Sequence, residues 1–290
     1  MSPAVLTHND ALTPAEPNTP PEAPAAPSSS GYVPYVAPEQ ASIFSLPLAD
    51  LPVSAPLDWI KKGYADFMCS PKTGLFYGLC FFLMGRTLWT VFNSAPAYVL
   101  ALSAGFLLVG PFLCLGLYHS SREIEQGRST SLRQSLMAWR PTMGAMGIFA
   151  GVLLILEMIW ARASLIVFAV TFNNVPSAES TLSQLFTMDN IGFMITYAVV
   201  GGIFAGLIFV TSAISIPMIM DRQVDAVSAG LTSIRACFQN PGAMFFWGFL
   251  ITLLIGLSML PFFLGLLIVG PVMGHATWHA YRAIVPPQSA

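Results

Sequence analysis

The sequence predicts an all-α integral membrane protein, a polytopic bundle of six transmembrane helices arranged as three hairpin repeats. Of its 290 residues, 55% are hydrophobic and only 9% are charged, whereas a soluble domain carries about 25% charged residues. Several apolar runs approach or exceed the roughly 20 residues that span a bilayer. A third observation is a repeat, because GFLLVGPFLCLGLYHSSR at 105–122 returns as GLLIVGPVMGHATWHAYR at 265–282.

The first part of the chain is rich in proline, alanine and serine. Residues 1–55 contain few large apolar side chains to bury, so we expect a disordered cytoplasmic tail. No basic region followed by a hydrophobic stretch is present here, which indicates that there is no cleavable signal peptide. We therefore expect a membrane domain over residues 56–285 and a short C-terminal tail over 286–290.

The sequence predicts three copies of one unit, which consists of a short amphipathic surface helix, a proline, a span, a turn and a second span. Pro71, Pro141 and Pro241 mark equivalent points, because the residue before a proline avoids helical angles. The expected surface helices cover residues 57–71, 131–140 and 221–241, and the expected spans cover about 74–92, 97–118, 143–172, 191–220, 243–259 and 262–281.

Basic residues predict the orientation. In the six-span arrangement, ten of the 12 lysines and arginines fall on one side, leaving Arg86 and Arg162. Arg122, Arg222 and Arg282 follow span ends and serve as topology markers. The positive-inside rule then places both termini in the cytoplasm.

Three stretches carry a family resemblance: SAISIPMIMDRQVDAVSAGLTSIRACFQNP at 212–241, GFLLVGPFLCLGLYHSSREIEQG at 105–127, and the Trp-Arg-Pro at 139–141. Together they resemble a widespread bacterial family of predicted integral membrane proteins of unknown function (DUF2189), over about residues 57–284. The resemblance implies a bacterial inner-membrane location and several spans, and it assigns no activity.

Some members of that family carry a cytochrome oxidase label, which the histidines here do not support. A haem-copper core needs several intramembrane histidines, and this chain has four in all. His275 and His279 lie four residues apart and share a helix face, and His119 is the repeat equivalent of His279. The three imidazoles are candidate ligands of Zn²⁺, copper or nickel; alternatively, they hydrogen-bond the backbone or lipid headgroups. No other cofactor is expected.

Glu157 is the one acid deep in an apolar run, where a lone charge is costly. It lies 16 residues beyond Pro141, and Arg86 lies 15 residues beyond Pro71, so both come out about 22–24 Å along their helices. We expect the two to pair. The pair either fixes helix register or forms a proton or substrate site, while Arg162 snorkels outward.

Two function classes remain open. No Walker loop, nucleophile elbow, HExxH or GxGxxG motif occurs, so an enzyme is not expected. The formal net charge of −2 argues against a nucleic-acid binder. The scarcity of polar residues in the spans favours a structural or assembly component of the membrane, contacting lipids and a membrane-protein partner. The alternative is a transporter or channel for small molecules or ions, using Glu157. The oligomeric state is left open.

Overall fold

The computed structural model describes residues 46–94, 99–171 and 191–286, and in these ranges every regular element is a helix. In chain order the helices are α1 (Ala55–Cys69), α2 (Pro71–Ser94), α3 (Val99–Glu125), α4 (Leu132–Met137), the 3-10 helix η3 (Arg140–Thr142), α5 (Met143–Thr171), α7 (Ile191–Ser212), α8 (Ser215–Arg222), α9 (Ala226–Gln239), α10 (Pro241–Met259) and α11 (Leu266–Ile284). The all-α class is confirmed for the described residues. The expected tail up to residue 45 and the expected loop over 173–190 lie outside them.

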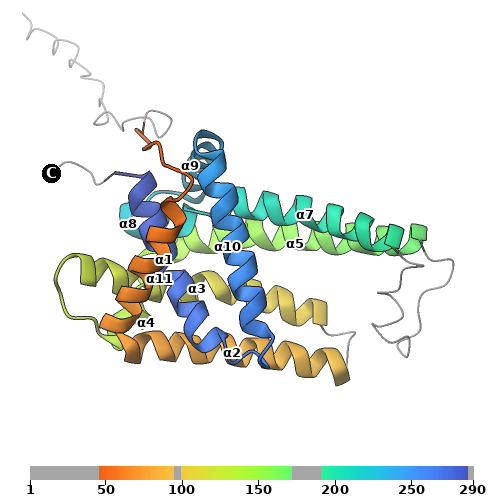
Figure 1. The fold of residues 1–290 in the computed structure, drawn as a ribbon, viewed down its shortest axis with the longest axis horizontal. Helices are drawn as coiled ribbons and strands as arrows, with labels where there is room; N and C mark the ends of the chain where they lie inside the picture. The colour runs from red at the N-terminus through yellow and green to blue at the C-terminus, as the bar shows by residue number, and fades with distance from the viewer. Residues whose placement is uncertain (1–45, 95–98, 172–190, 287–290) are drawn as a thin grey trace, which may run out of the picture. The chain divides into compact units, whose positions relative to one another are not determined.

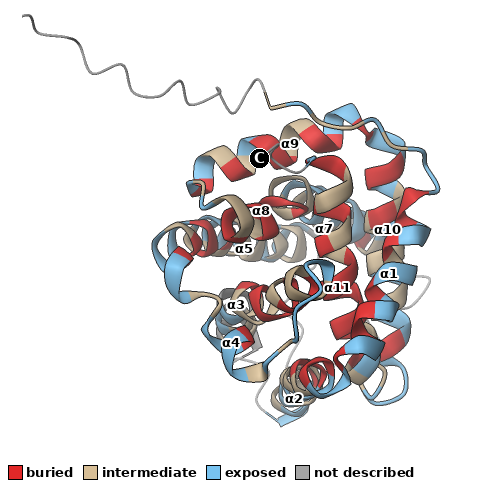
Figure 2. Ribbon diagram, turned by 90° about the vertical axis from the view of Figure 1, so that its left-hand side faces the viewer, coloured by how far each residue is buried: buried red, intermediate tan, exposed pale blue. Residues whose placement is uncertain are grey.

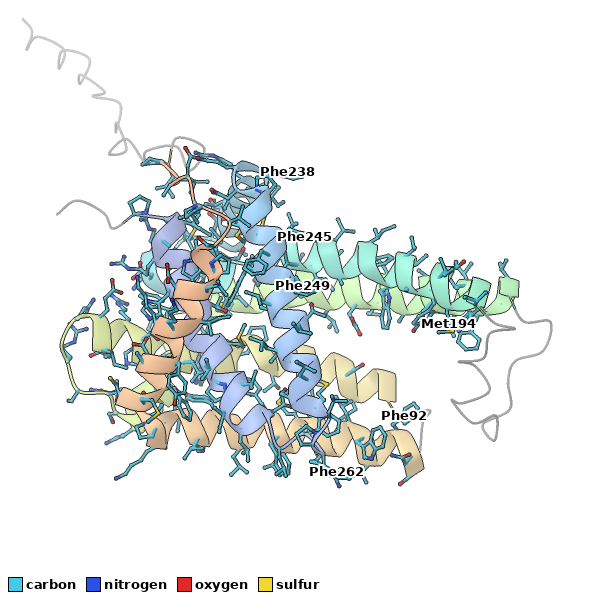
Figure 3. The ribbon with its side chains drawn as sticks, in the orientation of Figure 1. Phe92, Met194, Phe238, Phe245, Phe249 and Phe262 are labelled. Atoms are coloured by element: carbon cyan, nitrogen blue, oxygen red, sulfur yellow. The ribbon has the colours of Figure 1, made fainter. Side chains whose placement is uncertain are left out.

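Four stretches are long and apolar enough to cross a membrane: Pro71–Ser94, Leu132–Val170, Ile191–Arg222 and Pro241–Met259. Helices α5 and α7 run side by side and extend away from the remaining helices (Figure 1). Apolar side chains project outward from these stretches, as Phe245 and Phe249 of α10 illustrate (Figure 3). Within the described part of the chain, α3 and α11 are not among the four, so the six predicted spans are confirmed only in part.

Helix α11 lies at the centre of the remaining helices. It packs against α1, α2, α3, α8 and α10, and the ribbon of α11 and of the helices around it is coloured largely as buried (Figure 2). His275 and Tyr281 are completely buried, and Trp278 is 1% exposed. The expected sixth span over 262–281 therefore differs from what is found: α11 begins only at Leu266, and protein rather than lipid covers its polar second half.

Two glycines allow α1 and α2 to approach the backbone of α11. A methyl group at Gly63 of α1 would lie 2.6 Å from the carbonyl oxygen of Val272. A methyl group at Gly78 of α2 would collide with the carbonyl oxygen of Leu267. That carbonyl has no helical N–H partner four residues on, because Pro271 stands there. The Val-Gly-Pro motif thus marks the place where α2 meets α11.

The expected single span over 191–220 is broken into α7 and α8. Pro217 lies in the first turn of α8, where a missing N–H is tolerated. At the break, Ser233 of α9 donates its hydroxyl to the carbonyl of Val210 at 2.7 Å and accepts the N–H of Ile214 at 3.4 Å. The backbone groups at the break are therefore hydrogen-bonded by a side chain that is distant in the sequence. The continuous apolar run over 191–220 gave no sign of this break.

The α1–α2 and α9–α10 junctions have the same geometry. Ser70 (φ −131°, ψ 57°) and Asn240 (φ −121°, ψ 55°) each donate the backbone N–H to a carbonyl four residues earlier, just before the proline that begins the next helix. The order of buried, half-buried and exposed residues over 66–77 recurs unchanged over 236–247. This local match is what a repeat predicts, and the full three-hairpin arrangement stays a prediction.

The chain before α1 is attached to the helices, in contrast to the expected tail that ran to residue 55. The N–H of Ala49 donates to the carbonyl of Ile284 at 2.9 Å. The N–H of Leu51 donates to Oδ1 of Asn240 at 2.8 Å, and Asn240 Nδ2 donates back to the carbonyl of Ala49 at 3.0 Å. Backbone groups that are paired in this way hold residues 46–55 in place.

We predict that Gly63→Ala destabilises the protein, because the new methyl group must push α1 away from α11. Overpacking of this kind costs about 1–3 kcal/mol, and the melting temperature in detergent should fall by several degrees. Gly230→Ala in α9 is the control, because nothing lies within 4 Å of its added methyl group. Equal melting temperatures for the two variants would contradict the close approach.

Candidate functional site

A buried chain of hydrogen bonds joins α1, α3 and α11. Ser121 Oγ donates to Asp66 Oδ2 at 2.7 Å, and His279 Nε2 lies 2.8 Å from the same oxygen. Ser121 Oγ is also 2.7 Å from His275 Nδ1. Because the only hydroxyl proton goes to the carboxylate, His275 Nδ1 must be the donor of that bond. We call these four residues the polar clasp.

His275 is neutral in the clasp. Burial lowers its pKa from 6.5 to about 4, although Asp66 acts in the opposite direction. The proton therefore stays on Nδ1, and Nε2 is buried with no hydrogen-bond partner among the described residues. A buried lone pair costs less than a buried charge. The clasp is therefore a hydrogen-bond chain that runs from the neutral imidazole of His275 through the hydroxyl of Ser121 to the carboxylate of Asp66.

The three histidines proposed as metal ligands do not converge. His275 and His279 belong to the clasp, whereas His119 lies near Glu123 and Arg128, which act on its titration. Burial lowers the pKa of His119. Within the described residues, no three His, Cys, Asp or Glu side chains are placed to hold a metal ion. Aligning 105–122 with 265–282 gave His119 and His279 equivalent positions on their helices. In the structure α3 and α11 pack against different helices, so the two side chains have different surroundings.

The three arginines predicted as topology markers gather around Asp221. Arg122 Nε and a terminal nitrogen of Arg282 lie 3.7 Å and 3.9 Å from its carboxylate. Tyr281 donates to Asp221 at 2.7 Å and accepts from Arg222 Nε at 3.2 Å. One end of the protein is thus an ion-pair network, and the side of the membrane that these arginines mark stays a prediction.

Arg282 also links this network to the clasp end of α11. It donates twice to Glu125, at 3.0 Å and 2.9 Å, and Trp278 Nε1 donates to the same carboxylate at 3.1 Å. Glu125 and Arg282 line a cavity of about 320 Å³ together with His279 and Lys62. The clasp therefore reaches the surface at His279.

Sequence reasoning missed Asp66 and Ser121. Asp66 sits in a short amphipathic segment where a charged side chain is ordinarily exposed, yet it is 7% exposed here. A signal was available: Asp66 falls on the same helical face as Trp59 and Gly63, at spacings of seven and three residues. An acid on the apolar face of a helix predicts a buried partner.

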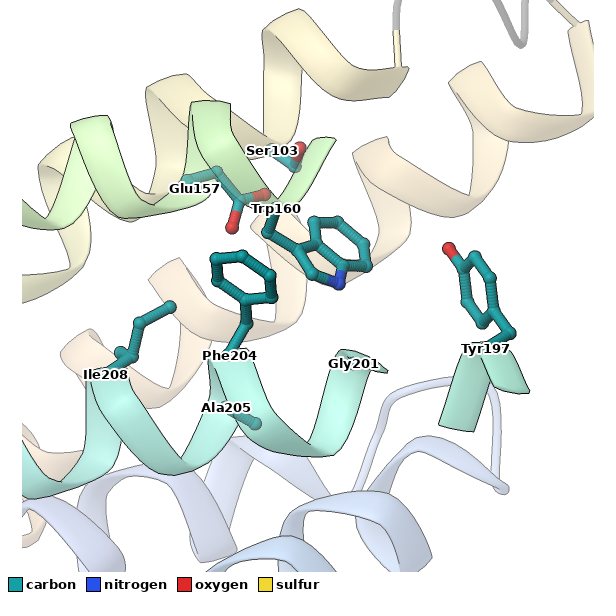
Figure 4. A pocket seen from close by; sticks show the side chains of 8 residues that line it. All are labelled: Ser103, Glu157, Trp160, Tyr197, Gly201, Phe204, Ala205 and Ile208. Carbon is teal, nitrogen blue, oxygen red and sulfur yellow. The ribbon is translucent and has the colours of Figure 1, made fainter. Parts of the chain in front are cut away.

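Glu157 lines a second kind of site, a cavity of about 560 Å³ between α3, α5 and α7. Its carboxylate points into the space between α5 and α7, beside Trp160 and the ring of Phe204 (Figure 4). Tyr197 and Gly201 complete the side formed by α7. The cavity is thus walled by aromatic groups with one acid among them.

The expected pair between Arg86 and Glu157 does not form. No ion pair joins them among the described residues, and Thr90 of the next turn donates to the carbonyl of Arg86. Helices α2 and α5 have α3 between them, since α3 packs against both. Counting residues from the two prolines placed Arg86 and Glu157 at the same depth. The count does not show whether the helices that carry them are adjacent.

Residues 99–221 match the model of a family described as "Predicted integral membrane protein (DUF2189)". The match confirms the resemblance seen in the sequence, over a shorter part of the chain than expected. It runs from α3 to α8 and includes Glu157, Ser121 and Asp221, while Asp66 and α11 lie outside it. No curated protein and no solved structure matches the chain.

We predict that Asp66→Ala lowers the free energy of unfolding by about 3 kcal/mol, because two buried donors lose their acceptor. Melting in detergent, followed by circular dichroism, measures the change. Asp58→Ala on the same helix is the control, since its 3.4 Å contact with Lys61 is exposed on both sides. A small and equal effect of both substitutions would show that the clasp contributes nothing to stability.

We also predict that His275 makes stability fall in mild acid. Its folded pKa of about 4 lies below the ordinary 6.5, so the unfolded chain binds the proton first as pH falls through this window. The loss between pH 7 and pH 5 is about 2 kcal/mol. The slope of melting temperature against pH should flatten in His275→Asn. An unchanged slope in that variant would assign the acid sensitivity to another group.

Proposed function

We propose that this integral membrane protein, which carries a DUF2189 segment, binds a small hydrophobic cation at Glu157 and carries it within the membrane as a small-molecule transporter. The single observation behind the proposal is the acid in an aromatic cavity, with no lysine or arginine paired to it among the described residues. A ligand that brings its own positive charge would supply the missing partner.

The chemistry of the cavity favours such a ligand. A carboxylate in apolar surroundings is stabilised by a nearby cation. Trp160, Tyr197 and Phe204 offer ring faces, to which cations are attracted by about 0.5–2 kcal/mol each. A volume of about 560 Å³ is within the range of small-molecule pockets. Charge and shape therefore both select a hydrophobic cation over an anion or a polar solute.

The sequence favoured a structural or assembly role because few polar residues fall in the spans. A cavity that contains Glu157 shifts the balance toward the transport alternative, since a purely structural bundle has no need of an unpaired acid there. The structural role, with lipids and a membrane-protein partner, becomes the outcome that a failed binding test would support.

The placement in the membrane that we propose keeps the six-span plan. The apolar first halves of α3 and α11 enter the bilayer beside the four long apolar stretches, and their polar second halves form the end that holds the clasp. The arginines around Asp221 support a cytoplasmic location for that end, and with it both termini. The family resemblance supports the inner membrane of a bacterium.

We predict that purified protein binds tetraphenylphosphonium and that Glu157→Gln weakens this binding by about tenfold or more, since the charge of the partner is lost. Equilibrium dialysis in detergent measures the affinity. Glu123→Gln is the matched control, because Glu123 is paired with Arg128 at 2.7 Å in the polar end of α3. Equal affinities of wild type and Glu157→Gln would overturn the proposed function.

A further inference from the structure

A groove lies between α7 and α10, which belong to two of the stretches long and apolar enough to cross a membrane. It measures about 380 Å³. Gly206 and Phe209 line it on α7, and Phe245, Gly248 and Phe249 line it on α10. Because Phe245 and Phe249 are exposed, the groove opens on a surface that faces lipid when the two stretches span the bilayer.

Ala205 of α7 lines both this groove and the cavity at Glu157. Successive residues of a helix are about 100° apart. Ala205 therefore lies between the face of α7 that carries Phe204 and Ile208, on the side of Glu157 (Figure 4), and the face that carries Phe209, on the side of the groove. The two spaces are separated at this point by no more than one alanine residue. A ligand held at Glu157 can thus extend around α7 into the groove.

The groove suits a hydrocarbon chain. None of the described residues that line it is charged, and the hydroxyl of Thr252 already donates to the carbonyl of Gly248 at 2.9 Å. Ala205 also lines a third cavity, of about 430 Å³. The wall of that cavity contains four polar side chains: Tyr118, Ser212, Trp247 and Thr277. An apolar chain is matched by the apolar groove and not by this polar wall.

We propose that the ligand of Glu157 is a cationic amphiphile with one alkyl chain, which reaches Glu157 from the bilayer and keeps its chain in the groove between α7 and α10. This inference rests on the proposed function and names the chemical class of its ligand. Such a molecule dissolves in the bilayer, and the open side of the groove gives its chain a path from lipid into the protein. An anionic amphiphile is excluded, because the carboxylate of Glu157 would repel its head.

The test is photolabelling of the full-length protein in phosphatidylcholine nanodiscs. The probes are trimethylammonium ions with alkyl chains of increasing length, each ending in a diazirine, which loses N₂ on illumination and inserts into a neighbouring C–H bond. At least one probe should label residues 244–252 of α10, where that helix lines the groove, as read by peptide mass spectrometry. Glu157→Gln should lower this labelling by about tenfold or more, because the charged head loses its partner.

Two glycines of α7 provide a matched pair of variants. A methyl group added at Gly202 or at Gly206 meets nothing within 4 Å, so both positions accept a larger side chain. Gly206 lines the groove and Gly202 does not. Gly206→Leu should therefore remove the labelling of α10, whereas Gly202→Leu should keep it, and the melting temperature reports whether each variant folds. If Gly206→Leu does not fold, excess tetraphenylphosphonium on wild type takes its place and should remove the same labelling.

The outcomes separate this inference from the function on which it rests. Suppose that tetraphenylphosphonium binding depends on Glu157, but labelling of α10 is the same in Glu157→Gln or persists in folded Gly206→Leu. The groove then holds any chain from the bilayer, so this inference is wrong and the proposed function stands. Labelling that depends on Glu157 but falls only on other helices would overturn the groove as well. If neither tetraphenylphosphonium nor the probes depend on Glu157, the proposed function is wrong, and this inference is wrong with it.

Discussion

The carboxylate of Asp66 is the point at which α1, α3 and α11 are joined. It accepts from Ser121 and His279, and Ser121 extends the chain to His275. A buried acid is tolerated only where donors surround it, so the positions of three helices are set by one side chain. The glycine contacts of α1 and α2 with α11 depend on this register, because a shifted α1 would no longer bring Gly63 against Val272.

Paired and unpaired carboxylates divide the molecule. At the polar end, Asp66, Asp221 and Glu125 each accept from named donors. Along α5, α7 and α10 the polar groups are few, and the carboxylate of Glu157 meets no lysine or arginine among the described residues. A carboxylate left in that state in an apolar environment is costly. This contrast is the physical reason for placing ligand binding in the apolar part and rigidity in the polar part.

Hydrophobic runs and prolines were sufficient to predict most helices. The expected run over 143–172 is nearly the observed α5, and Pro71 and Pro241 begin α2 and α10 as predicted. The sequence did not show which helices are adjacent in the folded protein. The pairing of Arg86 with Glu157 failed because depth along a helix does not identify the adjacent helix. Asp66 was overlooked because its partners are 55 and 213 residues away, and the break after α7 depends on Ser233 of another helix.

Trp247 in α10 and Tyr77 in α2 have matching places, because each lies six residues after the proline that begins its helix and the burial pattern of the two stretches is the same. The hydroxyl of Tyr77 is 2.8 Å from that of Ser135, which in turn donates to the carbonyl of Gly116. The indole nitrogen of Trp247 is buried and has no hydrogen-bond partner among the described residues. The two junctions therefore share backbone geometry and burial but differ in the polar partner of the large aromatic ring. That difference depends on α4, which packs against α2 and α3, and local sequence similarity does not carry it.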